Sequence, residues 1–458
     1  DLEGGTDSET TLVAVSNESA APVLTSWTLW TDWGIPTLTF NVYLSGYGTQ
    51  TVNLRDVLGG VLPVTGPLSS NRHDPEVPEV AFPGCGGLDS DLPLPVVDMA
   101  ELRALHQGLA SPKSGLCAGS GTAGEGMAVG YVTVDVVNAC SLEKNPSSPG
   151  YFVAGGRGVA RNANVLLGDY FQVNPYQNSA QGDVAVHVRA DAEAFGSGYT
   201  FYGRFVAGSG ADNRQPLGAT YGSRYMSGGA FDGGTTLLVW RDPKAPSAPV
   251  ACGKLPSWAP LRHDWAAVFD EAGHVTLVQE DMGRFPWATQ RIPVGGEGGL
   301  PIYRPFGRFV VDLSHDGELF GEAAQGWVGV TASAERRYSI GMPAQVLAYP
   351  ENPPLVVPET GEMAAQSTPP ATTCEVEASP AATLLVPYFE VDLEGGTDSE
   401  TTLVAVSNES AAPVLTSWTL WTDWGIPTLT FNVHLSGYGT QTVNLRDVLG
   451  GVLPVTGP

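Results

Sequence analysis

The sequence is poor in charge, and above all in positive charge. Charged residues make up 15% of the chain, against about 25% in an average soluble domain. Only four of the 22 basic residues are lysine, and the net charge is −26. Such a chain lacks the cationic face that binds phosphate. This excludes general nucleic-acid binding and argues against binding to anionic membranes. Its acidity suits an exposed, soluble surface that cations can bridge.

Long apolar runs are also missing. No stretch approaches the roughly 18–20 consecutive apolar residues that a membrane-spanning helix needs. Apolar residues nevertheless make up 42% of the chain, which is ordinary for a globular protein. We therefore expect buried cores and no membrane span.

The five cysteines contain no C-x-x-C pair, which disfavours a zinc ribbon or a thioredoxin-like site. Scattered cysteines in an acidic, lysine-poor chain favour disulfides formed in an oxidising compartment, and so an extracellular or cell-surface location. Cys117 and Cys140 flank one short predicted strand and are the first expected pair, with Cys85 and either one as the rival. Cys374 is expected to pair with Cys252 or to cross-link neighbouring units. The alternative is that all five are buried and reduced.

Catalytic signatures are absent as well. The chain has no G-x-S-x-G elbow, no H-E-x-x-H and no phosphate-binding G-x-x-x-x-G-K-[ST]. Histidine and aspartate are adjacent at 263–264 and at 315–316, but neighbours on a strand point to opposite faces, so neither pair is expected to be a catalytic dyad. We therefore predict that the chain is not an enzyme. A secreted hydrolase is the least favoured alternative, because spacing does not reveal a pair of glycosidase carboxylates.

The residues that are abundant indicate an all-β fold. The chain holds 57 glycines and 36 prolines, with many threonines, valines and serines, which favours strands joined by frequent turns. We predict tandem β-sandwich-like domains, immunoglobulin-like or jelly-roll-like, with one short helix and one proline-rich linker.

The most informative feature is a repeated stretch. Residues 392–458 (the C-terminal copy) repeat residues 1–67 (the N-terminal copy) with a single change, Tyr43 to His434. Near-identity over this length indicates a recent duplication, a tandem array or a window of a repeating polymer. Within the N-terminal copy, strands are predicted at 11–15, 22–31, 37–44 and 49–54, the third from clean alternation of apolar and polar residues.

Between the copies we expect three segments. Residues 68–140 are loop-rich, with a helix capped by Asp98 and Glu101, ended by Gly108, and followed by a strand at 127–137. Residues 141–349 form a second β-domain, and 350–383 form an extended linker rich in proline, threonine and alanine. The final β-domain spans 384–458. The strands expected in the second domain are 164–174, 199–206, 235–241, 265–270, 275–280, 306–313 and 326–332.

A weaker repeat links 164–174 to 384–392 through the pattern L-L-x-x-Y-F-[EQ]-V-[DN]. We predict that 384–391 is a strand that joins one unit to the next. Its two alternating faces are Leu384, Val386, Tyr388 and Glu390 on one side, and Leu385, Pro387, Phe389 and Val391 on the other. The second face is apolar throughout and should meet a core, while the proline suits an edge position. The competing interpretation is that this strand only begins the domain that follows it.

These motifs carry a resemblance. With L-L-V-P-Y-F-E-V-D at 384–392 and T-L-W-T-D-W-G-I-P-T at 28–37, the chain resembles uncharacterised secreted bacterial β-rich proteins. That resemblance implies secretion and implies no activity.

Two groups of residues are candidate binding sites. Trp27, Trp30 and Trp33 are expected to be core or interface aromatics rather than a sugar-binding platform. An acidic turn supplies hard oxygen ligands of the kind that calcium prefers, the alternative being a solvated acidic turn. Its members are Asp392, Glu394, Asp398 and Glu400, repeated at Asp1, Glu3, Asp7 and Glu9. No other cofactor is expected.

We therefore expect a secreted structural protein that assembles with itself, head to tail, into an extracellular filament or surface array. Strand addition between units is a common way to build such fibres, and a head-to-tail contact that does not close gives a filament. The alternative is an extracellular adhesin that presents its aromatic or acidic loops to a glycan.

Overall fold

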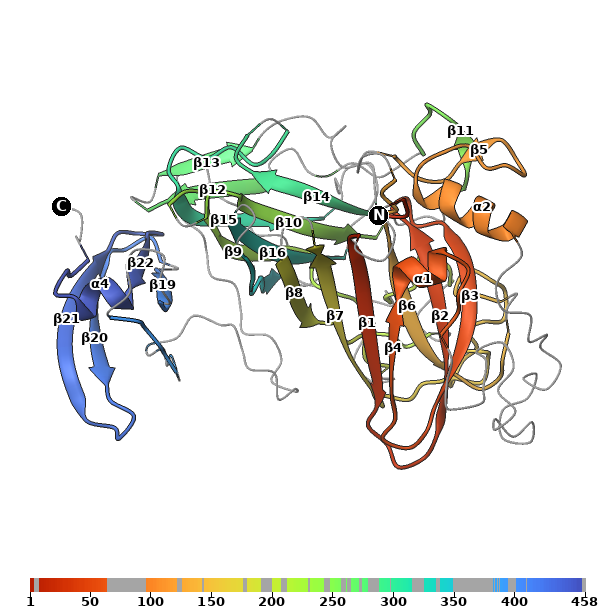
Figure 1. Ribbon diagram of the computed structural model, residues 1–458, viewed down its shortest axis with the longest axis horizontal. Coiled ribbons are helices and arrows are strands. Elements are labelled where there is room, and N and C mark those ends of the chain that lie inside the picture. The colour runs from red at the N-terminus through yellow and green to blue at the C-terminus, as the bar shows by residue number, and fades with distance from the viewer. Residues whose placement is uncertain are drawn as a thin grey trace.

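The computed structural model is drawn in Figure 1. It describes residues 1–3, 8–63, 96–121, 126–141, 144–175, 179–190, 200–206, 212–229, 231–242, 248–256, 261, 265–271, 274–278, 288–296, 298–314, 325–334, 338–348, 382, 384, 386, 388–393, 401–408 and 410–454. The described chain is mostly antiparallel β-structure in several sheets that pack as β-sandwich-like units, as predicted. The linker at 350–383 lies almost wholly outside the described residues.

The N-terminal unit is a sandwich of two sheets, with strand orders β4-β1-β7-β8 and β3-β2-β6. Its elements are β1 (Thr10–Asn17), β2 (Val23–Thr31), β3 (Pro36–Leu44), β4 (Thr49–Asn53), α1 (Leu54–Leu58), α2 (Val96–His106), β6 (Gly130–Val137), β7 (Leu166–Asn174) and β8 (Ser179–Val184). The first four strands and α1 come from the N-terminal copy, and later segments complete both sheets. The sandwich therefore crosses the boundaries drawn from the sequence at 67 and 140.

Alternation along β2 and β3 explains this packing. Trp27 of β2 and Phe40 of β3 point into the sandwich, where their rings stack with centroids 5.8 Å apart. Neighbouring positions of both strands point to the opposite, outer face of the sheet. That outer face is covered by a second cluster that includes Leu24 and Trp30. Both faces of β2 are thus buried, and β2 is the central strand of its sheet.

The central unit, green in Figure 1, is a second sandwich whose sheets have the orders β14-β10-β16-β17 and β13-β12-β15-β9-β18. Its strands are β9 (Thr220–Met226), β10 (Gly234–Arg241), β12 (Ala266–Asp270), β13 (Val275–Val278), β14 (Thr289–Val294), β15 (Phe306–Asp312), β16 (Gly326–Ala334), β17 (Tyr338–Met342) and β18 (Gln345–Ala348). Its core includes Tyr221, Leu237, Phe309 and Val328. A separate two-stranded ladder joins β5 (Leu116–Cys117) to β11 (Val250–Ala251).

The C-terminal unit repeats the local fold of the first copy. Its elements are β19 (Leu403–Ser407), β20 (Val414–Trp421), β21 (Pro427–Leu435), β22 (Thr440–Asn444) and α4 (Leu445–Leu449). Within the described residues, β19 pairs with β22 alone and β20 with β21 alone. The unit lies at the opposite end of the molecule from the N-terminal unit (Figure 1).

Three local predictions were wrong. Helix α2 begins at Val96, so Asp98 lies inside its first turn and not at its cap. Asp98 instead accepts a hydrogen bond from Lys113 Nζ at 2.7 Å, while Glu101 accepts one from the Ser111 hydroxyl. Residues 200–206 form turns rather than a strand, since they wrap over the outer face of β2. The described residues between 384 and 391 are not assigned to a strand, and 388–391 contact the Thr402 side chain and the core of the C-terminal unit.

Candidate assembly interface

The outer face of the N-terminal copy is held in an aromatic pocket, which we define as Tyr131, Thr133, Arg204 and Phe205. Trp30 fills it. The indole ring of Trp30 stacks on Tyr131 and on Phe205, with centroids 5.7 and 5.6 Å away, and its Nε1 donates to Thr133 Oγ1 at 2.9 Å. The ring is fully buried. Trp30 therefore fills a site that matches the shape of its ring and offers an acceptor for its single N–H donor.

Arg204 closes the pocket from the turn at 200–206. Its guanidinium carbon lies 5.2 Å from the Trp30 centroid and 4.5 Å from that of Phe205. Nη2 donates to the Tyr131 hydroxyl at 2.6 Å, and Nη1 lies 3.8 Å from Asp242. The side chain is only 4% exposed. Because a buried guanidinium must be compensated, the aromatic faces and Asp242 together hold it in place.

A buried polar cluster anchors β6 beside the pocket. Asp135 accepts hydrogen bonds from the hydroxyls of Tyr151 and Tyr202, at 3.1 and 2.9 Å, and from Arg214 Nε at 3.0 Å. Burial, and then the negative charge of Asp135, hold the pKa of both tyrosine hydroxyls well above its ordinary value, so both remain donors. Asp212 adds a second carboxylate to Arg214. All of these groups are satisfied by one another, which indicates a structural rather than a catalytic cluster.

The same face of the C-terminal copy is open. Trp421, which corresponds to Trp30, is 53% exposed, and Trp424, which corresponds to the buried Trp33, is 84% exposed. Leu415 is 70% exposed, whereas Leu24 is 1% exposed. We define the outer face of the C-terminal copy as Leu415, Ser417, Trp421, Thr430, Asn432 and His434. The one difference between the copies, Tyr43 against His434, lies on this face.

The β21–β22 hairpin tip and β19 of the C-terminal copy contact the central unit. Tyr438, at the tip of the β21–β22 hairpin, packs on Phe269 and Val310 of the central unit. An Arg224 guanidinium nitrogen donates to the carbonyl oxygen of Ala405 on β19. The contact at Tyr438 has no equivalent in the N-terminal copy, where the counterpart Tyr47 is 71% exposed.

Two ionisable groups lie at the β2–β3 turn of the N-terminal copy: Asp32 is in the turn, and His106 contacts Thr37 of β3. Burial raises the pKa of Asp32 to about 6, against the lowering effect of hydrogen bonds from Ser120. Burial lowers the pKa of His106 to about 4. His106 Nδ1 faces the Val129 carbonyl at 3.0 Å and must carry the proton, so Nε2 accepts from the Thr37 hydroxyl at 2.7 Å. Burial therefore disfavours the charged form of both groups relative to the unfolded chain.

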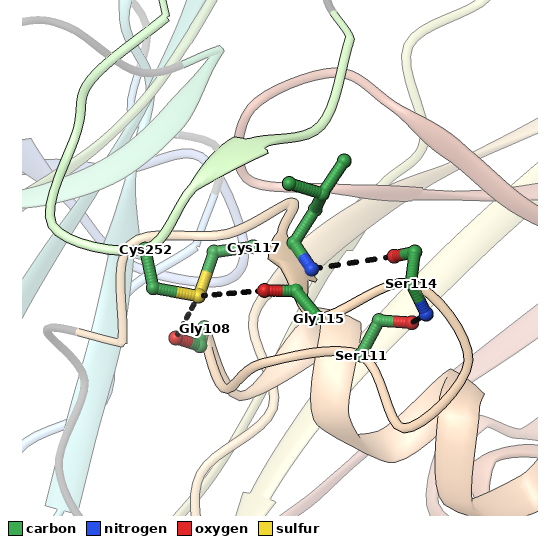
Figure 2. Close-up of a disulfide and its surroundings, with 7 residues drawn as sticks. Gly108, Ser111, Ser114, Gly115, Cys117 and Cys252 are labelled. Atoms are coloured by element: carbon green, nitrogen blue, oxygen red, sulfur yellow. Dashed lines mark hydrogen bonds between the residues drawn. A yellow bond between two sulfur atoms is a disulfide. The ribbon is translucent and has the colours of Figure 1, made fainter.

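The disulfide prediction was wrong in its pairing. Cys117 is bonded to Cys252, which excludes both Cys117–Cys140 and Cys252–Cys374. Figure 2 shows the bond joining β5 to the segment that follows β11, next to Gly108 and Gly115. The β5–β11 ladder brings these distant segments together, which nearness in sequence could not predict. Cys140 is also in a disulfide, and the two remaining cysteines, Cys85 and Cys374, lie outside the described residues.

The predicted joining segment lies against its own C-terminal unit. Phe389 and Val391 pack on the core formed by Leu420, Phe431 and neighbouring residues. The Glu390 carbonyl oxygen accepts a hydrogen bond from the Thr402 hydroxyl at 2.9 Å, and the Glu390 backbone N–H donates to the same hydroxyl at 3.0 Å. Leu384, Val386 and Tyr388 are exposed, in keeping with the expected alternation, whereas Leu385 and Pro387 lie outside the described residues. This placement corresponds to the competing interpretation, in which the segment begins the domain that follows it.

The predicted acidic turn is only partly described. Asp392 is exposed, and Glu394, Asp398 and Glu400 lie outside the described residues, as do Asp7 and both histidine–aspartate pairs. In the N-terminal copy, Glu9 is 3.4 Å from Arg291 and accepts from Asn174 at 3.0 Å. The described part of the chain holds no group of three potential metal ligands. Glu9 thus has protein partners, and the calcium site stays a prediction.

Comparison with known proteins gives no match to a family model, to a curated protein or to a solved structure. Across the described ranges, no helix is long and apolar enough to cross a membrane. The Trp27, Trp30 and Trp33 side chains are buried in the N-terminal copy, as expected for core aromatics. The sequence did not identify Tyr131, Arg204 and Phe205 as one pocket. Tyr131 lies in a strand expected at 127–137, and Arg204 and Phe205 lie in a segment that was expected to be a strand but is a turn folded over another sheet.

Proposed function

We propose that this chain is a secreted structural protein that assembles with itself, through its repeated β-units, into an extracellular filament or surface array. One observation carries the proposal. The near-identical copy packs, in its N-terminal position, against β6 and the aromatic pocket of the same chain, so the chain carries both members of a complementary pair of surfaces and repeats one of them. In the repeated copy Trp421 and Trp424 are 53% and 84% exposed, and exposed large apolar side chains are a feature of interaction sites.

The open edge of β20 supports the same function. Its counterpart β2 is paired on both sides, with β3 and β6, whereas β20 pairs with β21 alone among the described strands. An edge strand with unpaired backbone groups is a template for pairing with another chain.

Secretion is supported by the Cys117–Cys252 disulfide, since disulfides form and persist in oxidising compartments. An extracellular location follows as part of the proposal. The exposed tryptophans would also suit an adhesin that binds glycan. However, the same residues are packed core in the N-terminal copy, which favours a protein partner over a sugar.

Assembly of the purified full-length chain can be measured by light scattering and by negative-stain electron microscopy, over a range of concentrations and without added ligand. We expect concentration-dependent growth of regular fibres or sheets. The double variant Trp421→Ser/Trp424→Ser should reduce assembly, and Tyr303→Ser, which removes an equally exposed aromatic of the central unit, should not. A chain that stays monomeric at all concentrations would contradict the proposed function.

A further inference from the structure

We propose that a patch of the central unit, formed by Phe269, Arg308 and Val310, is a receptor for the hairpin tip that both copies carry. In an assembly this receptor patch takes Tyr47 of a second molecule of this chain, in competition with Tyr438 of its own chain. The inference rests on the proposed function, because the partner is a second copy, and it names the two surfaces that meet.

The receptor patch binds an aromatic ring in the structure. Phe269 of β12 lies opposite Arg308 of β15 in their ladder, and the neighbours of both residues in sequence belong to the central core, so the patch points to the other face of the sheet. The Tyr438 ring lies 5.6 Å from the Phe269 ring and 5.3 Å from the Arg308 guanidinium carbon, between centroids or from the centroid. Tyr438 is only 5% exposed. Ring contact and a cation–π interaction therefore make up the recognition.

The two hairpin tips present the same residue in the same conformation. Residues 44–51 and 435–442 have one sequence, L-S-G-Y-G-T-Q-T. Tyr47 and Tyr438 have φ of 57° and 56°, in the left-handed region that is uncommon for a bulky side chain. Backbone strain of this kind clusters at binding and switch sites. A tyrosine held there, where asparagine or glycine would suit the turn better, indicates a role for its ring in binding.

The tip is separate from the surfaces that complete a sandwich. Strands β6, β7 and β8 extend the two sheets of the N-terminal copy, and Tyr47 is nevertheless 71% exposed. The contact at Tyr438 thus uses a surface that those strands leave uncovered. The bond from Arg224 to Ala405 is different, because the counterpart Ala14 lies within the β1–β7 ladder. We therefore assign recognition to the tip and not to β19.

Two identical tips compete for one receptor patch in each chain. Tyr438 is tethered to the patch by its own chain, and a tether of this kind gives an effective concentration on the order of millimolar. Tyr47 of a second molecule competes only at its actual concentration. The tip of the C-terminal copy therefore limits association through the patch, and removing its ring should favour association.

The first test compares three full-length variants: Tyr438→Asn, Tyr47→Asn and the double variant. Asparagine tolerates the left-handed conformation, so the turn is kept while the ring is removed. Sedimentation velocity measures the concentration for half-maximal association, and circular dichroism checks that each variant is folded. Tyr438→Asn should lower this concentration by about tenfold or more, because the tethered competitor is gone. Tyr47→Asn should raise it, and the double variant should associate no better than Tyr47→Asn.

A second measurement identifies the surfaces in contact. Photoreactive benzoylphenylalanine replaces Tyr47 in unlabelled chains, which are mixed with isotope-labelled Tyr438→Asn chains. A cross-link between an unlabelled and a labelled peptide can form only between molecules. Illumination should join the unlabelled tip to labelled β12 or β15. Tyr388, which is 72% exposed, is the matched control position, and the same photoreactive residue there should give no labelled β12 or β15 peptide.

Two results would overturn the inference: unchanged association in Tyr438→Asn, or cross-links from position 47 that do not include β12 or β15 of a second molecule. The proposed function has a separate failure. Wild-type fibres that persist unchanged in Tyr47→Asn would keep the function and contradict this interface. A wild-type chain that stays monomeric at all concentrations, while Tyr438→Asn associates through Tyr47, would contradict the function and support the receptor patch.

Discussion

Tyr438 packs its ring against the guanidinium group of Arg308, whose carbon lies 5.3 Å from the ring centroid. The same guanidinium lies 4.5 Å from the Phe269 ring, so an arginine contacts aromatic rings from two units. The equivalent Tyr47 has a similar backbone conformation, with φ of 57° against 56°, but it is exposed. The hairpin tip therefore has the same conformation in both places, and the neighbour decides whether its tyrosine is buried.

The first prediction follows from this pair. Tyr438→Ala should detach the C-terminal unit from the central sheet, since it removes a buried ring and a cation–π contact at a cost of about 3 kcal/mol. Hydrogen exchange of β15 and β22 in the full chain should then increase. Tyr47→Ala is the matched control at the same turn, and its stability should change by less than about 0.5 kcal/mol. Equal effects from both substitutions would show that the turn itself, and not the interface, depends on tyrosine.

The second prediction concerns the Cys117–Cys252 disulfide, which closes a sequence separation of 135 residues. Cys252→Ser should lower the free energy of unfolding by about 2–5 kcal/mol, because the unfolded chain regains the freedom of a long loop. Denaturant unfolding of the variant measures the loss. The Cys117→Ser/Cys252→Ser double variant should lose no more than the single one. Non-reducing peptide mapping that places Cys117 with another cysteine would contradict the assignment.

The third prediction is a pair of opposite pH dependences. The pKa of Asp32 is raised from 3.8 to about 6, so the folded state binds more protons than the unfolded state between these values, and stability falls as pH rises through them. The pKa of His106 is lowered from 6.5 to about 4, so in nearly the same window stability falls as pH drops. The two effects should nearly cancel in the wild type.

Single variants should separate these effects. Relative to wild type, His106→Gln should become more stable as pH falls from 6.5 to 4, because the unfavourable protonation of the histidine is gone. Asp32→Asn should become less stable over about the same range, since the histidine then acts alone. Each change should be on the order of 3 kcal/mol across the window. Unfolding measured at several pH values tests this, and parallel curves for both variants would contradict the assignment of the two groups.

Local pattern predicted the strands of the repeat well. Alternation at 37–44 and the short turn around Tyr47 depend on neighbours in sequence, and β3 and β4 fall close to the expected ranges. The pairing of Cys117 with Cys252 and the turn that carries Arg204 depend on residues far away in sequence, so no local pattern contains them. The clearest limit is Trp30 and Trp421. Identical local sequences cannot predict that one tryptophan is buried and the other exposed.

The Asp98–Glu101 capping box shows a different kind of limit. The pattern has the residue types and the spacing of a cap, but the helix extends two residues before Asp98. The two carboxylates then bond Lys113 and Ser111 in the turn that follows the helix. Capping residues are equally good partners for a nearby turn, and which role they take depends on where the preceding chain runs.

The last prediction decides what the segment at 388–391 does. Phe389 packs on the core of the C-terminal unit, where a carboxylate would be buried without a partner. Phe389→Asp should therefore destabilise that unit by about 3 kcal/mol. Faster hydrogen exchange of β20 and β21 would show it, with β2 and β3 as an internal reference of nearly identical sequence. Tyr388→Asp is the matched control, because Tyr388 is 72% exposed, and it should leave exchange unchanged.

The opposite result would be equally informative. If Phe389→Asp abolishes assembly while exchange of β20 and β21 stays at the wild-type level, the segment leaves its own unit and joins a neighbour. Strand addition would then place Phe389 and Val391 in the core of another unit. If assembly and exchange are affected together, the segment is the first element of its own domain. Joining must then depend on another surface of the chain.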